Sequence, residues 1–161
     1  MAERKSQETQ SITLKSSDGV LFDVETNIVK EMKTIQSFMD ESEDITTIPL
    51  ANVLSQHLAT IIEYCKKHVS EDETEDARNK FDVESTKELS GEDMKLLFLA
   101  ANYLNIRSLL DLLAGALADH IKNKSVEFVR EFFNVENDYE PEEEAKLREE
   151  NQWAFGNVDE K

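Results

Sequence analysis

Residues 12–24 read ITLKSSDGVLFDV, and this stretch decides the fold class. Two β-prone runs, Ile12–Lys15 and Val20–Val24, flank a turn that ends in Asp-Gly, and this arrangement is typical of a β-hairpin. The short run Ile45–Leu50 is rich in β-branched residues and contains a proline near its end, so it predicts a third strand at a sheet edge. A small sheet beside the helical patterns that follow predicts an α/β (α+β) fold.

Apolar residues recur every three or four positions over most of the remaining chain, which predicts helices. The segments with this spacing are Asn27–Met39, Asn52–Cys65, Asp93–Leu104, Ile106–Ile121 and Ser125–Phe133. Asn52 or Ser55 is the expected cap of the second segment, and we expect a break near Asn105. Pro141 and the three glutamates after it predict a last helix that runs toward Trp153.

The 161 residues carry a net charge of -17. A field of this sign repels phosphate backbones and anionic lipids, so we expect neither nucleic acid nor a membrane as a direct partner. The first eleven residues are almost entirely polar and no apolar run approaches the ~20 residues of a bilayer span, which favours a cytoplasmic and nuclear protein. Residues 70–93 hold ten of the acidic side chains, and we interpret about 70–86 as a solvated loop.

Residues suited to catalysis are sparse. His57 and Cys65 lie eight residues apart on one predicted helix, about 12 Å along its axis, so they cannot share a metal ion without bending it. Cys65 would be a nucleophile only if His68 reached it, and a cysteine on the apolar face of a helix is more often an inert packed residue. We therefore predict no catalytic residue, no metal and no cofactor.

The acidic C-terminal region contains aromatic side chains, and catalysis does not explain their presence. They are Phe128, Phe132, Phe133, Tyr139, Trp153 and Phe155. Either they pack back onto the domain or they form a surface that a partner covers. The residues alone indicate an acidic interaction module of mixed α and β structure.

An ordered series of motifs then identifies a family. They are Leu14–Gly19, Ile62–His68, Leu99–Ile106, Leu109–Asp111, Phe133–Val135, Asn137–Asp138, Pro141–Glu144 and Arg148–Trp153. The series resembles the Skp-type adaptor subunits of Skp-cullin-F-box (SCF) ubiquitin ligases over almost the entire chain. The resemblance implies a BTB/POZ-type fold over residues 11–121, with a small sheet flanked by helices, after a disordered segment 1–10. A C-terminal helical extension that binds F-box proteins is implied for residues 122–161.

The function implied by this resemblance is that of a non-catalytic adaptor. Such a subunit bridges the N-terminal domain of a cullin scaffold to F-box substrate receptors for ubiquitin-dependent protein degradation. The family's cullin-facing pair matches Asn102 and Tyr103. The family's F-box surface corresponds to Leu97, Leu110, Leu117, Ile121, Val129, Arg130, Phe133, Asn134 and Trp153.

The sequence also departs from the family pattern. Met94-Lys95 stands where the family usually has Leu-Phe, and Ser125-Val126 stands where it has Thr-Pro. Glu136 replaces a common lysine. These changes suggest a divergent paralogue with an altered set of F-box partners, in which Met94 and Lys95 alter specificity.

Two alternatives stay open at this point. An elongin-type cullin adaptor shares the fold but lacks the long extension, so residues 125–155 argue against it. An F-box-binding structural subunit outside a ubiquitin ligase would look nearly the same, although the retained Asn102 and Tyr103 lean against it. We also expect the apolar tail to make the isolated chain self-associate or stay partly disordered.

Overall fold

The computed structural model describes residues 10–42, 45–156 and 158. The chain divides into two compact units, Met1–Leu117 (unit 1) and Ala118–Lys161 (unit 2). The division falls inside the last long helix, four residues before the boundary expected between domain and extension. The N-terminal segment predicted to be disordered, residues 1–10, lies outside the described residues except for Gln10.

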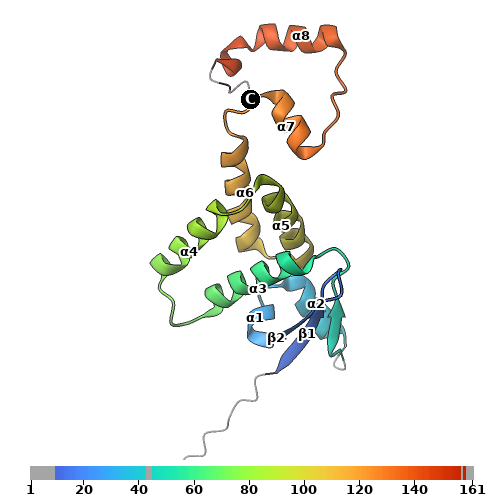
Figure 1. Ribbon diagram of the computed structural model, residues 1–161, viewed down its shortest axis with the longest axis vertical. Coiled ribbons are helices and arrows are strands. Elements are labelled where there is room, and N and C mark those ends of the chain that lie inside the picture. Colours follow the sequence, from blue (N-terminus) through green and yellow to red (C-terminus); the bar gives the residue numbers. More distant parts are fainter. Residues whose placement is uncertain (1–9, 43–44, 157, 159–161) are drawn as a thin grey trace, which may run out of the picture. The chain divides into compact units, whose positions relative to one another are not determined.

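A three-stranded sheet opens unit 1 (Figure 1). β1 (Ser11–Lys15) pairs antiparallel with β2 (Leu21–Glu25), with Leu14 opposite Phe22. β3 (Thr47–Pro49) pairs parallel with β1, so the strand order is β2-β1-β3 and β3 lies at an edge. Gly19 closes the hairpin at φ 86°, a conformation that side chains with a Cβ rarely adopt. The predicted hairpin and third edge strand are both confirmed.

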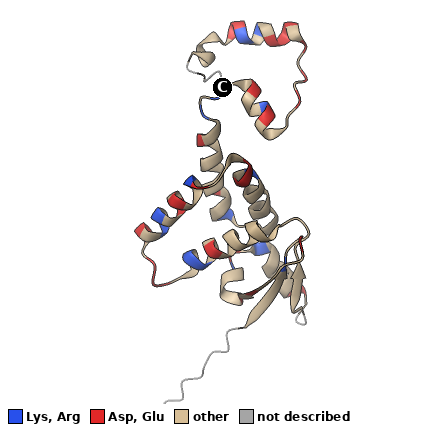
Figure 2. Cartoon of the chain, in the orientation of Figure 1, with Lys and Arg blue, Asp and Glu red and all other residues tan. Residues whose placement is uncertain are grey.

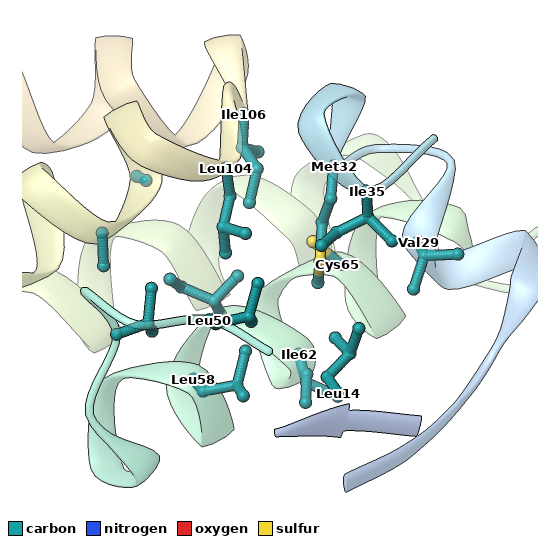
Figure 3. Close-up of a cluster of buried hydrophobic side chains, with 14 of the residues drawn as sticks. Leu14, Val29, Met32, Ile35, Leu50, Leu58, Ile62, Cys65, Leu104 and Ile106 are labelled. Atoms are coloured by element: carbon teal, nitrogen blue, oxygen red, sulfur yellow. The ribbon is translucent and has the colours of Figure 1, made fainter. Parts of the chain in front are cut away.

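Six helices complete the fold around this sheet: α1 (Thr26–Val29), α2 (Lys33–Glu41), α3 (Ser55–Val69), α4 (Glu75–Lys87), α5 (Gly91–Leu104) and α6 (Arg107–Ile121). The apolar faces of α1, α2, α3, α5 and α6 share one core with β1, in which Leu14, Leu50, Leu58 and Leu104 are fully buried (Figure 3). Asn105 takes the left-handed conformation (φ 54°) between α5 and α6. The predicted break at Asn105 is therefore confirmed, and short polar side chains such as asparagine tolerate this conformation.

The predicted solvated loop at about 70–86 is wrong over most of its length, because Glu75–Lys87 forms α4. None of its side chains is buried, and charges of both signs follow one another along it (Figure 2). Thr74 caps it by accepting a hydrogen bond from the Ala77 amide at 3.2 Å. Polar contacts then hold α4 on α3, including His68 Nε2 at 2.9 Å from Asp82 Oδ1. A helix held this way has no apolar stripe for a sequence pattern to display.

The start of α3 also differs from the expectation. Neither Asn52 nor Ser55 caps it, since Ser55 is its first helical residue and Leu54 occupies the cap position. The Ser55 amide donates instead to Asp18 Oδ1 at 2.9 Å, and the Ser55 hydroxyl donates to Oδ2 of the same carboxylate. A hairpin residue therefore caps α3 from 37 positions away, which local sequence patterns do not reveal.

Unit 2 contains α7 (Val126–Phe133), α8 (Pro141–Glu150) and the 3₁₀ helix η1 (Gln152–Phe155). Ser125 caps α7, and Pro141 opens α8 as the sequence predicts. The last α-helix ends at Glu150, and η1 carries the chain past Trp153. None of these three helices has a buried side chain.

Candidate partner-binding sites

One candidate surface lies on α5 in unit 1. Asn102 is exposed and Tyr103 is partly buried. Leu99 lies three and four positions before them, so all three residues share one face of the helix, and 61% of Leu99 is exposed. The Thr34 hydroxyl of α2 donates to the Tyr103 carbonyl at 2.7 Å, which ties this face to α2. The sequence analysis did not predict Leu99 as part of this surface. Its spacing of three and four positions from Asn102 and Tyr103 would have placed it on the same helix face.

The two residues that depart from the family pattern lie near the start of α5. Met94 is buried, so its side chain is part of the packed interior. Lys95 Nζ lies 2.6 Å from Glu92 Oε2 on the preceding turn, and about a quarter of the lysine side chain is exposed. The cation is thus neutralised within its own helix.

The residues of the predicted F-box surface divide between the two units. In unit 1, Leu97 and Leu117 are buried and Leu110 is partly buried, and Leu97 belongs to the main core. For Leu97 the structure thus shows core packing. Each aliphatic residue of the predicted F-box surface could instead serve only the packing of the chain itself. This second explanation is weakest for the residues that are most exposed.

In unit 2 the remaining predicted residues are more exposed. Ile121, Val129 and Arg130 are partly buried, whereas Phe133 and Asn134 are exposed. Asn134 ends α7 in the left-handed conformation at φ 53°.

Trp153 is the most exposed of the large hydrophobic residues that the structure describes, with 84% of its surface exposed. It borders a groove of about 370 Å³ that Val126, Leu147 and Phe155 also line. Of the predicted F-box residues in unit 2, the structure brings Arg130 and Trp153 to this one groove.

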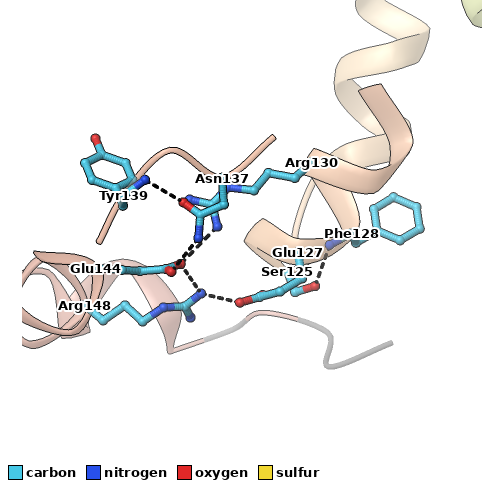
Figure 4. A network of polar contacts seen from close by, with 8 residues as sticks. All are labelled: Ser125, Glu127, Phe128, Arg130, Asn137, Tyr139, Glu144 and Arg148. Carbon is cyan, nitrogen blue, oxygen red and sulfur yellow. Dashed lines mark hydrogen bonds and ion pairs between the residues drawn. The ribbon is translucent and has the colours of Figure 1, made fainter. Parts of the chain in front are cut away.

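A polar network that forms part of the groove lining joins α7 to α8 (Figure 4). Glu144 accepts from Arg130 Nη1 at 3.0 Å, from Asn137 Nδ2 at 2.7 Å and from Arg148 Nη2 at 3.1 Å. Arg148 also pairs with Glu127 of α7. The hydrogen bonds from Arg130, Asn137 and Arg148 hold the pKa of Glu144 at about 2. The sequence analysis predicted Arg130 as a site residue, but it did not predict that Arg130 pairs with Glu144.

Comparison with known proteins gives the family. The model described as "Skp1 family, tetramerisation domain" matches residues 10–70, and that described as "Skp1 family, dimerisation domain" matches residues 107–154. SKP1-like protein 14 of Arabidopsis thaliana is 44% identical over 91% of this chain and 98% of its own length. SKP1-like protein 12 of the same organism is 47% identical over the same shares of both chains. The chain belongs to the Skp1 family.

Membership of the Skp1 family confirms the resemblance read from the sequence motifs and the BTB/POZ-type α/β fold that it implied. It also confirms the function class, an adaptor subunit of an SCF ubiquitin ligase. Neither the elongin-type adaptor nor the structural subunit outside a ubiquitin ligase gains support from these matches.

The one cysteine of this Skp1-family chain is a packed core residue. Cys65 is fully buried, and burial raises its pKa to about 12, so the thiolate does not form near neutral pH. His68 contacts Asp82 and stacks on Tyr64, with the ring centroids 4.1 Å apart. The interpretation of Cys65 as a packed residue is confirmed.

Proposed function

We propose that this Skp1-family chain bridges a cullin to F-box proteins through two surfaces, one in each unit. The cullin-facing surface is the α5 face of Leu99, Asn102 and Tyr103, and the F-box-facing surface centres on the groove beside Trp153. A bridge needs two separate contact areas, since it acts by raising the effective concentration of one partner near the other. The observation that carries the proposal is the exposure of Trp153 in a unit whose helices bury no side chain.

The α5 face has the composition of a small contact area. Leu99 supplies exposed apolar surface, Asn102 an amide that donates and accepts hydrogen bonds, and Tyr103 a ring with a polar tip. The bond from Thr34 to the Tyr103 carbonyl fixes the backbone beneath this face. A rigid helix face costs less ordering entropy on binding than a loop does, which favours its use as a docking surface.

The groove of unit 2 has the composition of a recognition surface for an apolar segment. Tryptophan is among the residues that contribute most at protein interfaces, because it covers a large area at a low entropic cost. Leaving its indole in water is unfavourable for the isolated chain, and a partner that covers it removes that cost.

We further propose that the chain acts in the cytoplasm and nucleus, has no catalytic step of its own and serves ubiquitin-dependent degradation. Among the residues that the structure describes, no helix is both long and apolar enough to cross a bilayer. The inert Cys65 is consistent with a non-catalytic role.

Co-purification tests the bridge. The tagged chain is mixed with a cullin N-terminal domain and an F-box domain, separately and together. We expect Leu99→Ala and Tyr103→Ala to lose the cullin domain only, and Trp153→Ala to lose the F-box domain only. Leu21→Ala on β2 is the matched control for Leu99, because 61% of each leucine is exposed. F-box binding without any cullin binding would contradict the proposal and favour a structural subunit outside a ubiquitin ligase.

We also propose that Met94 and Lys95 alter the choice of F-box partner. The ion pair with Glu92 places a neutralised cation where the family usually has an aromatic ring. Titration of several F-box proteins against the chain and its Lys95→Phe variant tests this. We expect the rank order of affinities to change, and identical profiles would contradict the proposal.

A further inference from the structure

Three charged residues that line the groove of unit 2, Arg130, Glu144 and Arg148, are already paired within the chain. Arg130 and Arg148 both donate to Glu144, and Arg148 reaches Glu127 as well. About a fifth of the side chain is exposed for both Arg130 and Glu144, so this pair is screened from water more than the other ion pairs of α8. A guanidinium in such a pair offers little to a carboxylate on a partner, since its present partner would have to be displaced.

Glu144 joins three parts of unit 2. It receives a hydrogen bond from α7 through Arg130, from the connecting segment through Asn137, and from its own helix α8 through Arg148 (Figure 4). Arg148 in turn lies over the Phe155 ring of η1, 5.5 Å from its centroid. One carboxylate is therefore connected to every element that lines the groove.

Unit 2 needs such a connection because its apolar side chains are at most partly buried. None of the side chains on α7, α8 or η1 is buried, so the network provides much of what fixes these helices relative to one another. A partner that enters the groove gains from finding the walls already in place, because less ordering has to occur on binding.

We propose that Glu144 is the positioning residue of the unit 2 groove, and that Arg130 assists partner binding only through Glu144. This proposal rests on the F-box-binding function proposed above. It assigns the groove to an uncharged apolar segment of the partner. Val126, Leu147, Phe155 and Trp153 supply apolar lining, and the charged lining residues Arg130, Glu144 and Arg148 are paired with one another. Arg130 also lines the groove, but on this proposal its contribution to binding depends on its bond to Glu144.

A double-mutant cycle on the full chain tests this role. Arg130→Met removes the guanidinium, Glu144→Gln removes the charge of the acceptor, and the double variant carries both changes. We expect each single variant to weaken F-box-domain binding roughly tenfold, as loss of hydrogen bonds to a charged group does. We expect the double variant to lose no more affinity than the single variant that binds more weakly. Additive losses, about a hundredfold for the double variant, would overturn the proposal, because Arg130 would then contribute to binding independently of Glu144.

Lys146→Met and Glu150→Gln provide the matched control. Lys146 and Glu150 form an i,i+4 pair on α8, with 3.8 Å between Lys146 Nζ and Glu150 Oε1, and this pair does not link α7 to α8. The two control substitutions remove one positive and one negative charge, as the test substitutions do. We expect both control variants to bind the F-box domain as the unchanged chain does. Equal losses in the control and test variants would overturn the proposal, because net charge rather than the network would then set affinity.

A second readout separates this inference from the proposed function. Trp153 is the one tryptophan in the sequence, so its emission reports on unit 2 alone. The same cycle is repeated on the partner-free chain by following Trp153 emission against urea concentration. If the unchanged chain binds no F-box domain but the urea midpoints show coupling between Arg130 and Glu144, the positioning role stands and the proposed function fails. Additive shifts in these midpoints would overturn the positioning role itself.

Discussion

Filling a cavity under α4 should stabilise unit 1. The cavity measures about 280 Å³, and Leu97, Leu109 and Leu113 form its apolar wall. α4 contributes Phe81, Glu84, Ser85 and Thr86 to the lining, and Ser85 has the smallest side chain of these four. The Ser85 hydroxyl donates to the Asp82 carbonyl of its own helix at 3.0 Å, so replacing it leaves no buried donor without a partner.

Ser85→Leu adds three carbon atoms to this space. At about 0.8 kcal/mol per buried CH₂ the gain is about 2.4 kcal/mol for full burial, and the lost hydroxyl bond offsets part of it. We therefore expect a stabilisation of about 1 to 2 kcal/mol, in the range found for cavity-filling changes. For a chain of this length that corresponds to a rise in Tm of roughly 2 to 8 °C.

Circular dichroism at 222 nm during thermal unfolding measures this change. Ser37→Leu is the matched control, because Ser37 is exposed on α2 and its hydroxyl also donates to a carbonyl of its own helix at 3.0 Å. We expect the control to change stability by no more than about 0.5 kcal/mol. A Ser85→Leu variant that is no more stable than Ser37→Leu would refute the reasoning, since α4 would then have no space to fill.

Two further predictions concern single groups in unit 1. Because burial raises the pKa of Cys65 to about 12, we expect iodoacetamide at pH 8 to leave it unmodified in the folded chain and to alkylate it fully in urea, as measured by mass spectrometry. Hydrogen bonds from Ser16 and Ser55 lower the pKa of Asp18 from 3.8 to about 2, so its stabilising contribution is complete above pH 3.8 and is lost as the pH falls through 2. The difference in urea midpoint between the unchanged chain and Asp18→Asn should therefore shrink over that interval, and a constant difference would contradict the cap at the start of α3.

The parts of the fold that the sequence predicted are those whose signals are local. The hairpin is specified by a turn and two short runs, and the break at Asn105 by a residue that tolerates the left-handed conformation. Ser125 and Pro141 likewise mark helix starts without help from distant residues. For such features the physical cause and the sequence pattern lie within the same few positions.

The parts that it missed depend on contacts across the chain or on polar helices. α4 has its cap at Thr74 and acids in its first turn, but without an apolar stripe these signals were outweighed by the charge of the segment. The cap of α3 comes from Asp18, and Arg130 meets Glu144 only because residues 134–140 turn the chain back. Family resemblance supplied Asn102, Tyr103 and the F-box set, which no local pattern indicates.

Unit 2 should be the less stable part of the isolated chain. All the buried apolar residues that the structure describes lie at or before Leu117, so unit 2 lacks the burial that offsets the entropy of ordering a chain. Hydrogen exchange should therefore protect amides of α3 and α5 strongly in the partner-free chain, and those of α7 and α8 weakly. An F-box domain should slow exchange in α7 and α8, while Trp153→Ala should abolish that slowing.

The same exposed surface predicts self-association of the partner-free chain. Trp153, Phe133 and Val135 present apolar area that an isolated unit 2 leaves in water, and contact between two copies would cover part of it. Light scattering across a concentration series should show a growing mass that Trp153→Ala reduces and that an F-box domain reverses. A monodisperse monomer whose α7 and α8 amides resist exchange as strongly as α5 would contradict both expectations. The network around Glu144 would then be sufficient to hold unit 2 together without a buried core.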